Sequence, residues 1–246
     1  MSQALFSAAS GATYHEKRLA VLANNLANIS TVGYKQDKLI FKVPKAEAQK
    51  VSAGAKRYFL YSPPPMPSAT AVDFSQGGLK ATGKPLDVAI SGDGFFCIQT
   101  PRGRRYTRNG SFVLNQDGVL TTREGWPVQG GSGSITLSGQ DVRIDEKGNV
   151  YVDGDQVGAL KVVKIQDLHR LRKVGDGMFA PLDDEAVEME TKDVLIKQGF
   201  LESSNVNGLR AMTEMIDVMR GYESYQKVIH FLDDVARRSI TDVGRL

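Results

Sequence analysis

The chain has 246 residues, of which 41% are apolar and 24% are charged, a composition that predicts a packed core and excludes a disordered chain. The net charge of only +3 argues against a strongly electrostatic partner such as duplex DNA. No run of about 18 apolar residues occurs, so the sequence predicts no membrane-spanning helix.

The first predicted element is a helix over residues 3–29. Apolar and small residues recur in it at spacings of three and four, the pattern of a helix that packs along its length against other helices. This seam consists of Leu5, Ala8, Ala12, His15, Leu19, Leu22, Leu26 and Ile29. Gly11 interrupts the helix, and we interpret His15 as a packed seam residue rather than a ligand. Gly33 is expected to end it, because glycine takes the left-handed conformation that a tight turn needs.

Three asparagines, Asn24, Asn25 and Asn28, fall beside this seam. Their amides compete with the backbone for hydrogen bonds, which weakens a helix. A row of amides next to an apolar seam is consistent with a second contact surface and equally with a solvated polar face. The residues alone leave both interpretations open.

Residues 31–75 are predicted to form an extended linker or arm. The basic part of this segment, residues 35–57, carries seven basic and only two acidic residues. The four prolines within residues 63–67 favour a stiff polyproline stretch and exclude a central strand.

Residues 76–204 are predicted to form a β domain. Short runs of β-branched and apolar residues alternate there with glycine-containing turns, a pattern typical of an antiparallel barrel or sandwich. Asn109-Gly110 and Asp153-Gly154 favour the turns that close two-residue hairpins. The single cysteine, Cys97, lies in an apolar run, so we expect a buried residue and no internal disulfide.

The last predicted element is a helix over residues 205–239, which Asn205 or Asn207 can cap. Its predicted seam is Met212, Met215, Met219 and Tyr222, followed by Tyr225, Ile229, Leu232 and Ala236. The step from Tyr222 to Tyr225 breaks the alternation of three and four, which predicts a local slip in the packing of this helix.

The two terminal helices are expected to pair as a coiled coil and also to contact other chains. Apolar residues spread wider than one seam, as Val21 beside Leu22 shows, so a two-helix hairpin leaves apolar surface exposed. Subunits that associate head to tail without closing a ring form a helical filament. The predicted fold class is therefore α+β. Its parts are a helical domain of residues 1–30 plus 205–246, the arm of residues 31–75 and the β domain of residues 76–204.

Three motifs of the chain are specific enough to compare with known families. Residues 23–28 read ANNLAN and are followed by STVGYK. Residues 86–96 read LDVAISGDGFF and are followed by YTRNGSF at residues 106–112. Residues 201–206 read LESSNV and are followed by Arg220, Tyr222, Glu223 and Lys227. Together these motifs and their spacing resemble those of the flagellar rod and hook axial proteins.

The resemblance implies a structural subunit of the bacterial flagellar basal-body rod in the periplasm. In that family the paired termini form an inner tube around the export channel, and the β domain lies outside. The implied partners are further copies, other rod proteins and the flagellar type III export apparatus, with no nucleic acid, no membrane insertion and no cofactor. The first residues lack a basic n-region and an apolar h-region, so no cleaved signal peptide is expected, and these residues alone indicate the cytoplasm. The resemblance implies instead that the chain is exported through the flagellar type III apparatus without removal of a signal.

Within this family the sequence favours a proximal rod type over a distal one. The distal type carries a glycine-containing stretch after the segment that corresponds to Tyr34-Lys35, and this chain has the basic arm there instead. The expected assembly interface consists of Leu19, Leu22, Asn24, Asn25, Leu26, Asn28, Ile29, Met212, Met215, Met219, Tyr222, Tyr225, Ile229 and Leu232.

Two other classes of function fit the sequence less well. An enzyme is disfavoured because the three histidines, His15, His169 and His230, lie far apart and no nucleophile, zinc or phosphate-binding motif occurs. No catalytic, cofactor-binding or metal site is therefore predicted. A nucleic-acid-binding β module would use the arginines of residues 102–105 with Tyr106, namely Arg102, Arg104 and Arg105, but the near-neutral net charge disfavours phosphate binding.

Overall fold

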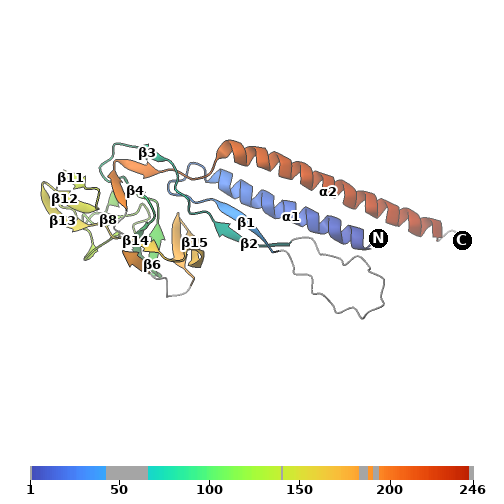
Figure 1. Cartoon of the computed structure of the whole chain (residues 1–246), viewed down its shortest axis with the longest axis horizontal. Helices are drawn as coiled ribbons and strands as arrows, with labels where there is room; N and C mark the ends of the chain where they lie inside the picture. Colours follow the sequence, from blue (N-terminus) through green and yellow to red (C-terminus); the bar gives the residue numbers. More distant parts are fainter. Residues whose placement is uncertain (1, 43–65, 140, 183–187, 191–193, 244–246) are drawn as a thin grey trace, which may run out of the picture. The chain divides into compact units, whose positions relative to one another are not determined.

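The computed structural model describes residues 2–42, 66–139, 141–182, 188–190 and 194–243 (Figure 1). The chain divides into two compact units, which we name the helical unit and the β unit. The helical unit consists of Met1–Leu26, Asp37–Ala71 and Asn207–Leu246, and the β unit consists of Ala27–Gln36 and Val72–Val206. Residues 43–65 of the predicted arm lie outside the described residues.

Two long helices lie antiparallel and side by side in the helical unit (Figure 1). Helix α1 spans Ser2–Ala27 and helix α2 spans Gly208–Val243, each within a few residues of the predicted bounds. Strand β1 (Asp37–Lys42) pairs with strand β2 (Met66–Val72) in a two-stranded sheet, within the segment predicted as an extended arm. Within the described ranges, neither helix is long and apolar enough to cross a membrane.

The β unit is built around a six-stranded sheet with the order β15-β16-β6-β5-β14-β17. In chain order these strands are β5 (Phe95–Thr100), β6 (Gly103–Thr107), β14 (Val162–Ile165), β15 (Leu171–Gly175), β16 (Met178–Pro181) and β17 (Glu188–Glu190). A 3₁₀ turn, Leu168–Arg170, precedes β15. The alternating pattern along β5 places its side chains on both faces of this sheet.

Smaller sheets complete the β unit. They comprise β3 (Leu79–Ala81) with β19 (Phe200–Glu202), β4 (Val88–Ser91) with β18 (Leu195–Gln198), β7 (Val113–Leu114) with β8 (Leu120–Thr121), β9 (Gln129–Gly130) with β10 (Gly133–Ser134), and β11 (Val142–Ile144) with β12 (Asn149–Val152) and β13 (Asp155–Ala159). Every pair described in this unit is antiparallel. The predicted α+β class, with paired terminal helices and a central antiparallel β region, is confirmed.

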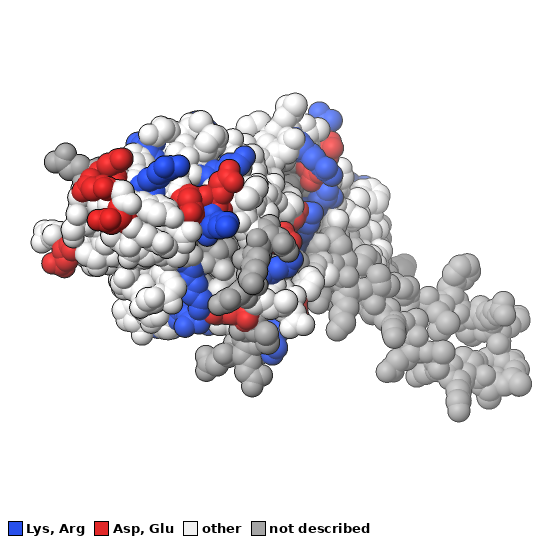
Figure 2. Space-filling view, turned by 60° about the vertical axis from the view of Figure 1, so that its left-hand side comes forward, with Lys and Arg blue, Asp and Glu red and all other residues white. Residues whose placement is uncertain are grey.

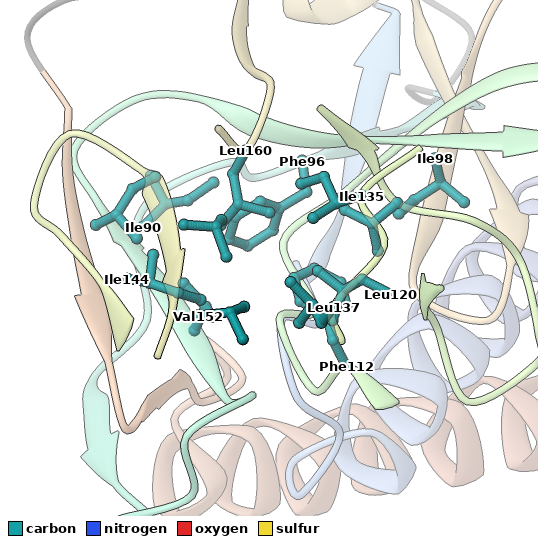
Figure 3. Packing of buried hydrophobic residues seen from close by; sticks show 14 of the residues in the cluster. Ile90, Phe96, Ile98, Phe112, Leu120, Ile135, Leu137, Ile144, Val152 and Leu160 are labelled. Carbon is teal, nitrogen blue, oxygen red and sulfur yellow. The ribbon is translucent and has the colours of Figure 1, made fainter. Parts of the chain in front are cut away.

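Two hydrophobic clusters form the core of the β unit, one on each face of β5. Phe96 and Ile98 point into the larger cluster, where Figure 3 shows them packed with residues from several strands and loops, such as Phe112. Phe95 and Cys97 point into the smaller cluster on the opposite face. The expected burial of Cys97 is confirmed, and burial raises the pKa of its thiol to about 12.

The two predicted hairpin turns behave differently. Asp153 and Gly154 both adopt positive φ, at 51° and 100°, and close the two-residue hairpin between β12 and β13 as predicted. The prediction for Asn109-Gly110 is wrong, because Gly110 does not adopt positive φ. Instead the Gly110 carbonyl accepts a hydrogen bond from Val88 N at 3.0 Å, and a Cβ at Gly110 would overlap the Val88 carbonyl. Here glycine is needed for close approach and not for a turn.

We predict that Phe96→Ala lowers the free energy of unfolding of the β unit by about 3–5 kcal/mol, since Phe96 is fully buried and stacks edge-on to Phe112 at 5.1 Å. Urea unfolding followed by tyrosine and tryptophan fluorescence measures the change. Val113→Ala is the control, because Val113 is 40% exposed and should lose less than about 1 kcal/mol. Equal losses in the two variants would contradict this placement of the core.

Candidate assembly surface

The helical unit is held by one continuous seam between α1 and α2. On α1 the seam residues Ala8, Ala12 and Leu22 are buried, and on α2 the seam begins at Ala211, which is also buried. The α2 seam continues through Met215, Val218, Tyr222, Tyr225, Ile229, Leu232 and Ala236, all of them buried or half-buried. These spacings alternate four and three throughout, so the seam follows a regular heptad pattern.

This assignment of the seam residues of α2 corrects two sequence-based predictions. Met212 and Met219 are not seam residues, because they are 51% and 45% exposed, and Ala211 and Val218 take the expected places one residue earlier. With that assignment the predicted slip between Tyr222 and Tyr225 does not occur. Hydropathy alone does not separate these neighbouring positions, because alanine, valine and methionine are all apolar.

Two glycines set the register of the helix pair. A Cβ at Gly11 of α1 would lie inside the Tyr225 ring, and a Cβ at Gly221 of α2 would lie within 2.5 Å of the His15 ring. The His15 and Tyr225 rings also contact each other, with their centroids 5.4 Å apart and their planes inclined by 40°. His15 is therefore a packed seam residue, as predicted. At each glycine the missing side chain leaves space that an aromatic ring of the other helix fills.

Two asparagines of the ANNLAN motif, Asn25 and Asn28, form hydrogen bonds within the chain. The Asn25 side chain is 4% exposed and forms two hydrogen bonds of 2.8 Å with the backbone of Asp37, donating to its carbonyl and accepting from its N–H. This is the bonding that a neighbouring strand would offer. Asn28 accepts a hydrogen bond from the Thr31 hydroxyl in the turn after α1, whereas Asn24 has an exposed side chain.

The motifs that follow α1 and precede α2 meet inside the β unit at one buried carboxylate, that of Glu202. Lys35 donates to Glu202 Oε1 at 2.7 Å, and Arg108 donates to Glu202 Oε2 at 3.2 Å. All three side chains are at least 96% buried. Gly77 N also donates to Oε1 at 2.8 Å, and Lys35 Nζ donates to the Ser75 carbonyl at 2.7 Å. We name Lys35, Arg108 and Glu202 the charged junction.

Arg108 is fixed on further sides. Its guanidinium donates to the Gly92 carbonyl at 2.8 Å and lies 5.3 Å from the centroid of the Phe95 ring. Burial lowers the pKa of Arg108, and the Glu202 carboxylate only partly offsets that effect. Burial likewise lowers the pKa of Lys35, and the Glu202 carboxylate, which raises that pKa, only partly offsets the effect. The junction thus carries two buried cations that depend on one carboxylate.

Gly33 lets the backbone of the segment after α1 pass close to the charged junction. It adopts φ of 67°, and a Cβ there would lie 2.6 Å from the backbone of Arg108 and Asn109. Its N–H donates to the Glu202 carbonyl at 2.7 Å. Positive φ at Gly33 agrees with the expected end of the helix, but the close approach to Arg108 was not predictable from the sequence.

The side-chain amide of Asn205 likewise joins backbone groups, in this case within the β unit. Its Oδ1 accepts from Gln36 N at 2.7 Å, and its Nδ2 donates to the carbonyls of Asp73 and Ser75 at 2.9 and 3.1 Å. Asn205 and Asn207 were the two predicted candidates for the cap of α2. Helix α2 begins at Gly208, and the Arg210 N–H donates to Asn207 Oδ1 at 3.0 Å. Asn207 is therefore the capping residue.

The arginines that a nucleic-acid-binding module would use lie on the β5–β6 hairpin. Arg104 forms an ion pair with Glu188, and Arg105 donates to the backbone carbonyls of Arg102 and Arg104. Burial alone would raise the pKa of Glu188, but hydrogen bonds from Arg104, Lys161 and Tyr106 outweigh it and lower that pKa. Basic and acidic side chains are intermingled on the face shown in Figure 2.

The predicted assembly residues fall into three classes of exposure. The buried ones are Leu22 and Asn25; the half-buried ones are Leu19, Leu26, Asn28, Met215, Tyr222, Tyr225, Ile229 and Leu232; the exposed ones are Asn24, Ile29, Met212 and Met219. The predicted interface omits five exposed apolar residues of α2, namely Leu209, Ile216, Val228, Phe231 and Val235. Their spacing of three and four from other apolar residues was the available signal.

Three family models match successive parts of the chain. Residues 5–35 match "Flagella basal body rod protein", residues 89–152 match "Flagellar hook protein FlgE/F/G D1 domain", and residues 197–242 match "Flagellar basal body rod FlgEFG protein C-terminal". The first and third of these models include Lys35 and Glu202 of the charged junction.

Curated relatives align with the chain over nearly its whole length. The flagellar basal-body rod protein FlgF of Caulobacter vibrioides is 32% identical over 249 aligned residues, with 100% of both chains covered. The rod protein FlgG of Bacillus subtilis is 32% identical over 272 residues, with 98% of each chain covered. FlgF of Salmonella typhimurium is 32% identical, with 95% of each chain covered. The chain belongs to the flagellar basal-body rod protein family.

This rod protein is a structural component of the flagellar basal body and not an enzyme. Membership in the family implies assembly with other rod proteins. Within the part of the chain that the structure describes, no group of three side chains suited to hold a metal ion gathers.

We predict that Gly221→Ala impairs assembly, although alanine ordinarily favours a helix over glycine by about 1 kcal/mol. The reason is that the added Cβ would meet the His15 ring and force the two helices apart, at a cost of about 1–3 kcal/mol. The measurement is the amount of chain in purified basal bodies. Thr213→Ala, at an exposed position of α2, is the control and should incorporate normally. Normal incorporation of both variants would contradict the prediction that Gly221 must leave space for the His15 ring.

We also predict that Glu202→Gln destabilises the β unit by about 3–5 kcal/mol, because it leaves Lys35 and Arg108 buried without a counter-charge. Urea unfolding at neutral pH gives the free energy. The matched control is Glu188→Gln, since the Arg104 and Lys161 partners of Glu188 are 48% and 30% exposed, and a loss of at most about 1 kcal/mol is expected. Similar losses for the two glutamates would argue against a special role of the junction.

Proposed function

We propose that this rod protein is a subunit of the proximal rod, of the FlgF type. Its terminal helices polymerise into the tubular shaft that transmits torque and encloses the export channel. The observation that carries this proposal is the apolar surface of α2 that remains exposed after pairing with α1. Its most exposed members are Leu209, Met212, Ile216, Val228 and Phe231.

The size of this exposed surface favours contact with other chains. Burying one such side chain stabilises an association by about 1.5–3 kcal/mol, so several of them on one helix provide a large driving force. The half-buried seam residues show that α1 covers only one side of α2. The predicted interface residues Met212 and Met219 lie within this surface, and Leu19, Leu22 and Leu26 support it by holding α1 in place.

The choice of the proximal type has two supports. The alignment with FlgF of C. vibrioides runs over 249 positions, close to the 246 residues of this chain. The alignment with FlgG of B. subtilis runs over 272 positions, so that FlgG carries residues that this chain lacks. The basic arm after Lys35, in place of a glycine-containing stretch, points the same way. Passage through the flagellar type III export apparatus is part of the same proposal.

Leu26→Asp is expected to abolish rod assembly and leave the β unit folded, because Leu26 is half-buried in the helical unit and a carboxylate there opposes helix packing. Motility in soft agar tests the first half, and thermal melting of the purified variant tests the second. Val157→Asp, which places the same charge at a 44% exposed position of β13, should keep both properties. A motile Leu26→Asp strain would contradict the role of the helices.

The position within the rod is tested by immunogold labelling of an epitope-tagged chain in purified basal bodies. Gold at the part of the rod nearest the inner membrane is expected for a proximal subunit. Gold along the outer part of the rod would assign the chain to the distal, FlgG-like type. Absence of the chain from basal bodies that are otherwise complete would overturn the proposed function.

A further inference from the structure

The β unit has a pocket of about 360 Å³ at the hairpin that joins β5 to β6. Its volume is within the range of pockets that bind small ligands. All of its lining residues belong to the described part of the chain. We name it the arginine pocket, after the residues that line it together with Gly103, which are Arg102, Arg104, Arg105, Tyr106, Pro181 and Glu188.

The guanidinium of Arg105 is held in place by the hairpin itself. Its Nη1 donates to the Arg104 carbonyl at 2.9 Å, and its Nη2 donates to the Arg102 carbonyl at 2.7 Å. These bonds use two of the five N–H groups of a guanidinium, so it keeps donors for a ligand. A side chain that is already held in one geometry loses less conformational entropy on binding. Arg105 therefore offers a prepared planar fork, the shape that pairs with a carboxylate through two hydrogen bonds.

Positive charge exceeds negative charge in the arginine pocket. The Glu188 carboxylate pairs with both Arg104 and Lys161, so it already serves two cations. Within the ranges that the structure describes, Arg102 and Arg105 form no ion pair with a carboxylate. Both of these arginines line the same pocket. The pocket is therefore complementary to an anionic group.

The pocket offers charge and hydrogen bonds but no aromatic face. Tyr106 is 3% exposed, and its hydroxyl donates to Glu188 at 2.8 Å, so its ring is not available for stacking. Stacking on aromatic rings supplies much of the affinity for single-stranded nucleic acids, and a duplex needs many phosphate contacts at once. An acidic peptide suits the pocket better, because each of its carboxylates can pair with one arginine.

We propose that the arginine pocket binds an acidic segment of a partner protein. The fixed fork of Arg105 holds one carboxylate of that segment, and Arg102 pairs with a second. Glu188 neutralises Arg104 and holds it in the wall of the pocket, so Arg102 and Arg105 carry the recognition. This inference goes beyond the proposed function, because it concerns the β unit and does not depend on how the terminal helices assemble.

A titration of the isotope-labelled full chain with an end-blocked tetraglutamate peptide tests the proposal, with the affinity measured from the shifts of backbone amide signals. Combining Arg102→Gln with Arg105→Gln is expected to weaken binding at least about tenfold, because two charge-assisted pairs are lost. The affinity of the unmodified chain should fall as salt is added, since exposed ion pairs are screened. Absence of binding to the unmodified chain at millimolar peptide would overturn the proposal.

The matched control combines Arg143→Gln with Lys147→Gln, which removes two exposed cations from the hairpin between β11 and β12. This variant loses the same net charge, and its affinity should change less than about twofold at salt near 0.1 M, where distant charges are screened. An equal loss in the two double variants would show that general attraction between charges causes the binding. That result would also overturn the proposed pocket.

Arg105→Lys separates the shape of the fork from its charge. Lysine keeps the positive charge but cannot form two parallel hydrogen bonds to one carboxylate, so the affinity is expected to fall at least about threefold. Unchanged affinity would overturn the role of the fork. Each variant should keep the amide signals of the unmodified chain outside the changed hairpin, because the replaced side chains are exposed or half-buried.

An oligothymidylate with the same charge as the peptide compares the two classes of partner. It should bind more weakly than the peptide, because the pocket has no aromatic face on which a base can stack. Tighter binding of the oligothymidylate that is lost with Arg102 and Arg105 would assign the pocket to nucleic acids and overturn the choice of a protein partner.

Discussion

The fold depends on one buried carboxylate, that of Glu202. It receives the ammonium of Lys35, the guanidinium of Arg108 and a backbone N–H, and so joins three segments that are far apart in the sequence. Two buried cations are costly, and only a carboxylate held at hydrogen-bonding distance makes their burial tolerable. For this reason the segment after α1 and the segment before α2 must both reach the same point of the β unit. An apolar cluster of similar size would have allowed many arrangements, whereas this one is specific.

Two asparagine side chains also join segments that are separate in the sequence, in this case through hydrogen bonds to the backbone. Asn25 in the helical unit and Asn205 in the β unit each pair with backbone groups through both amide atoms. They satisfy backbone N–H and carbonyl groups in the way that a neighbouring strand would. The asparagines next to an apolar seam were open to two interpretations. For Asn25 the structure adds a third, loop closure within the chain.

In the helix pair, glycines leave space for large side chains of the other helix. Gly11 and Gly221 each leave space for an aromatic ring of the other helix, and the buried Ala211 and Val218 lie on the seam of α2. The exposed methionines of α2 follow from this choice of phase. Pairing with α1 covers one face of α2 and leaves apolar residues elsewhere on that helix exposed.

The sequence by itself determined the two helices, the antiparallel β region, the burial of Cys97 and the family. These properties rest on local periodicity, turn chemistry and contiguous motifs, which a single chain displays in order. The tertiary structure alone decided that Lys35, Arg108 and Glu202 meet, that Gly110 serves close packing and that the α2 seam runs through Ala211 and not Met212. The physical reason is that each of these depends on atoms distant in the sequence. Hydropathy alone does not choose between neighbouring apolar residues at a seam, and only the packing of the two helices decides which of them is buried.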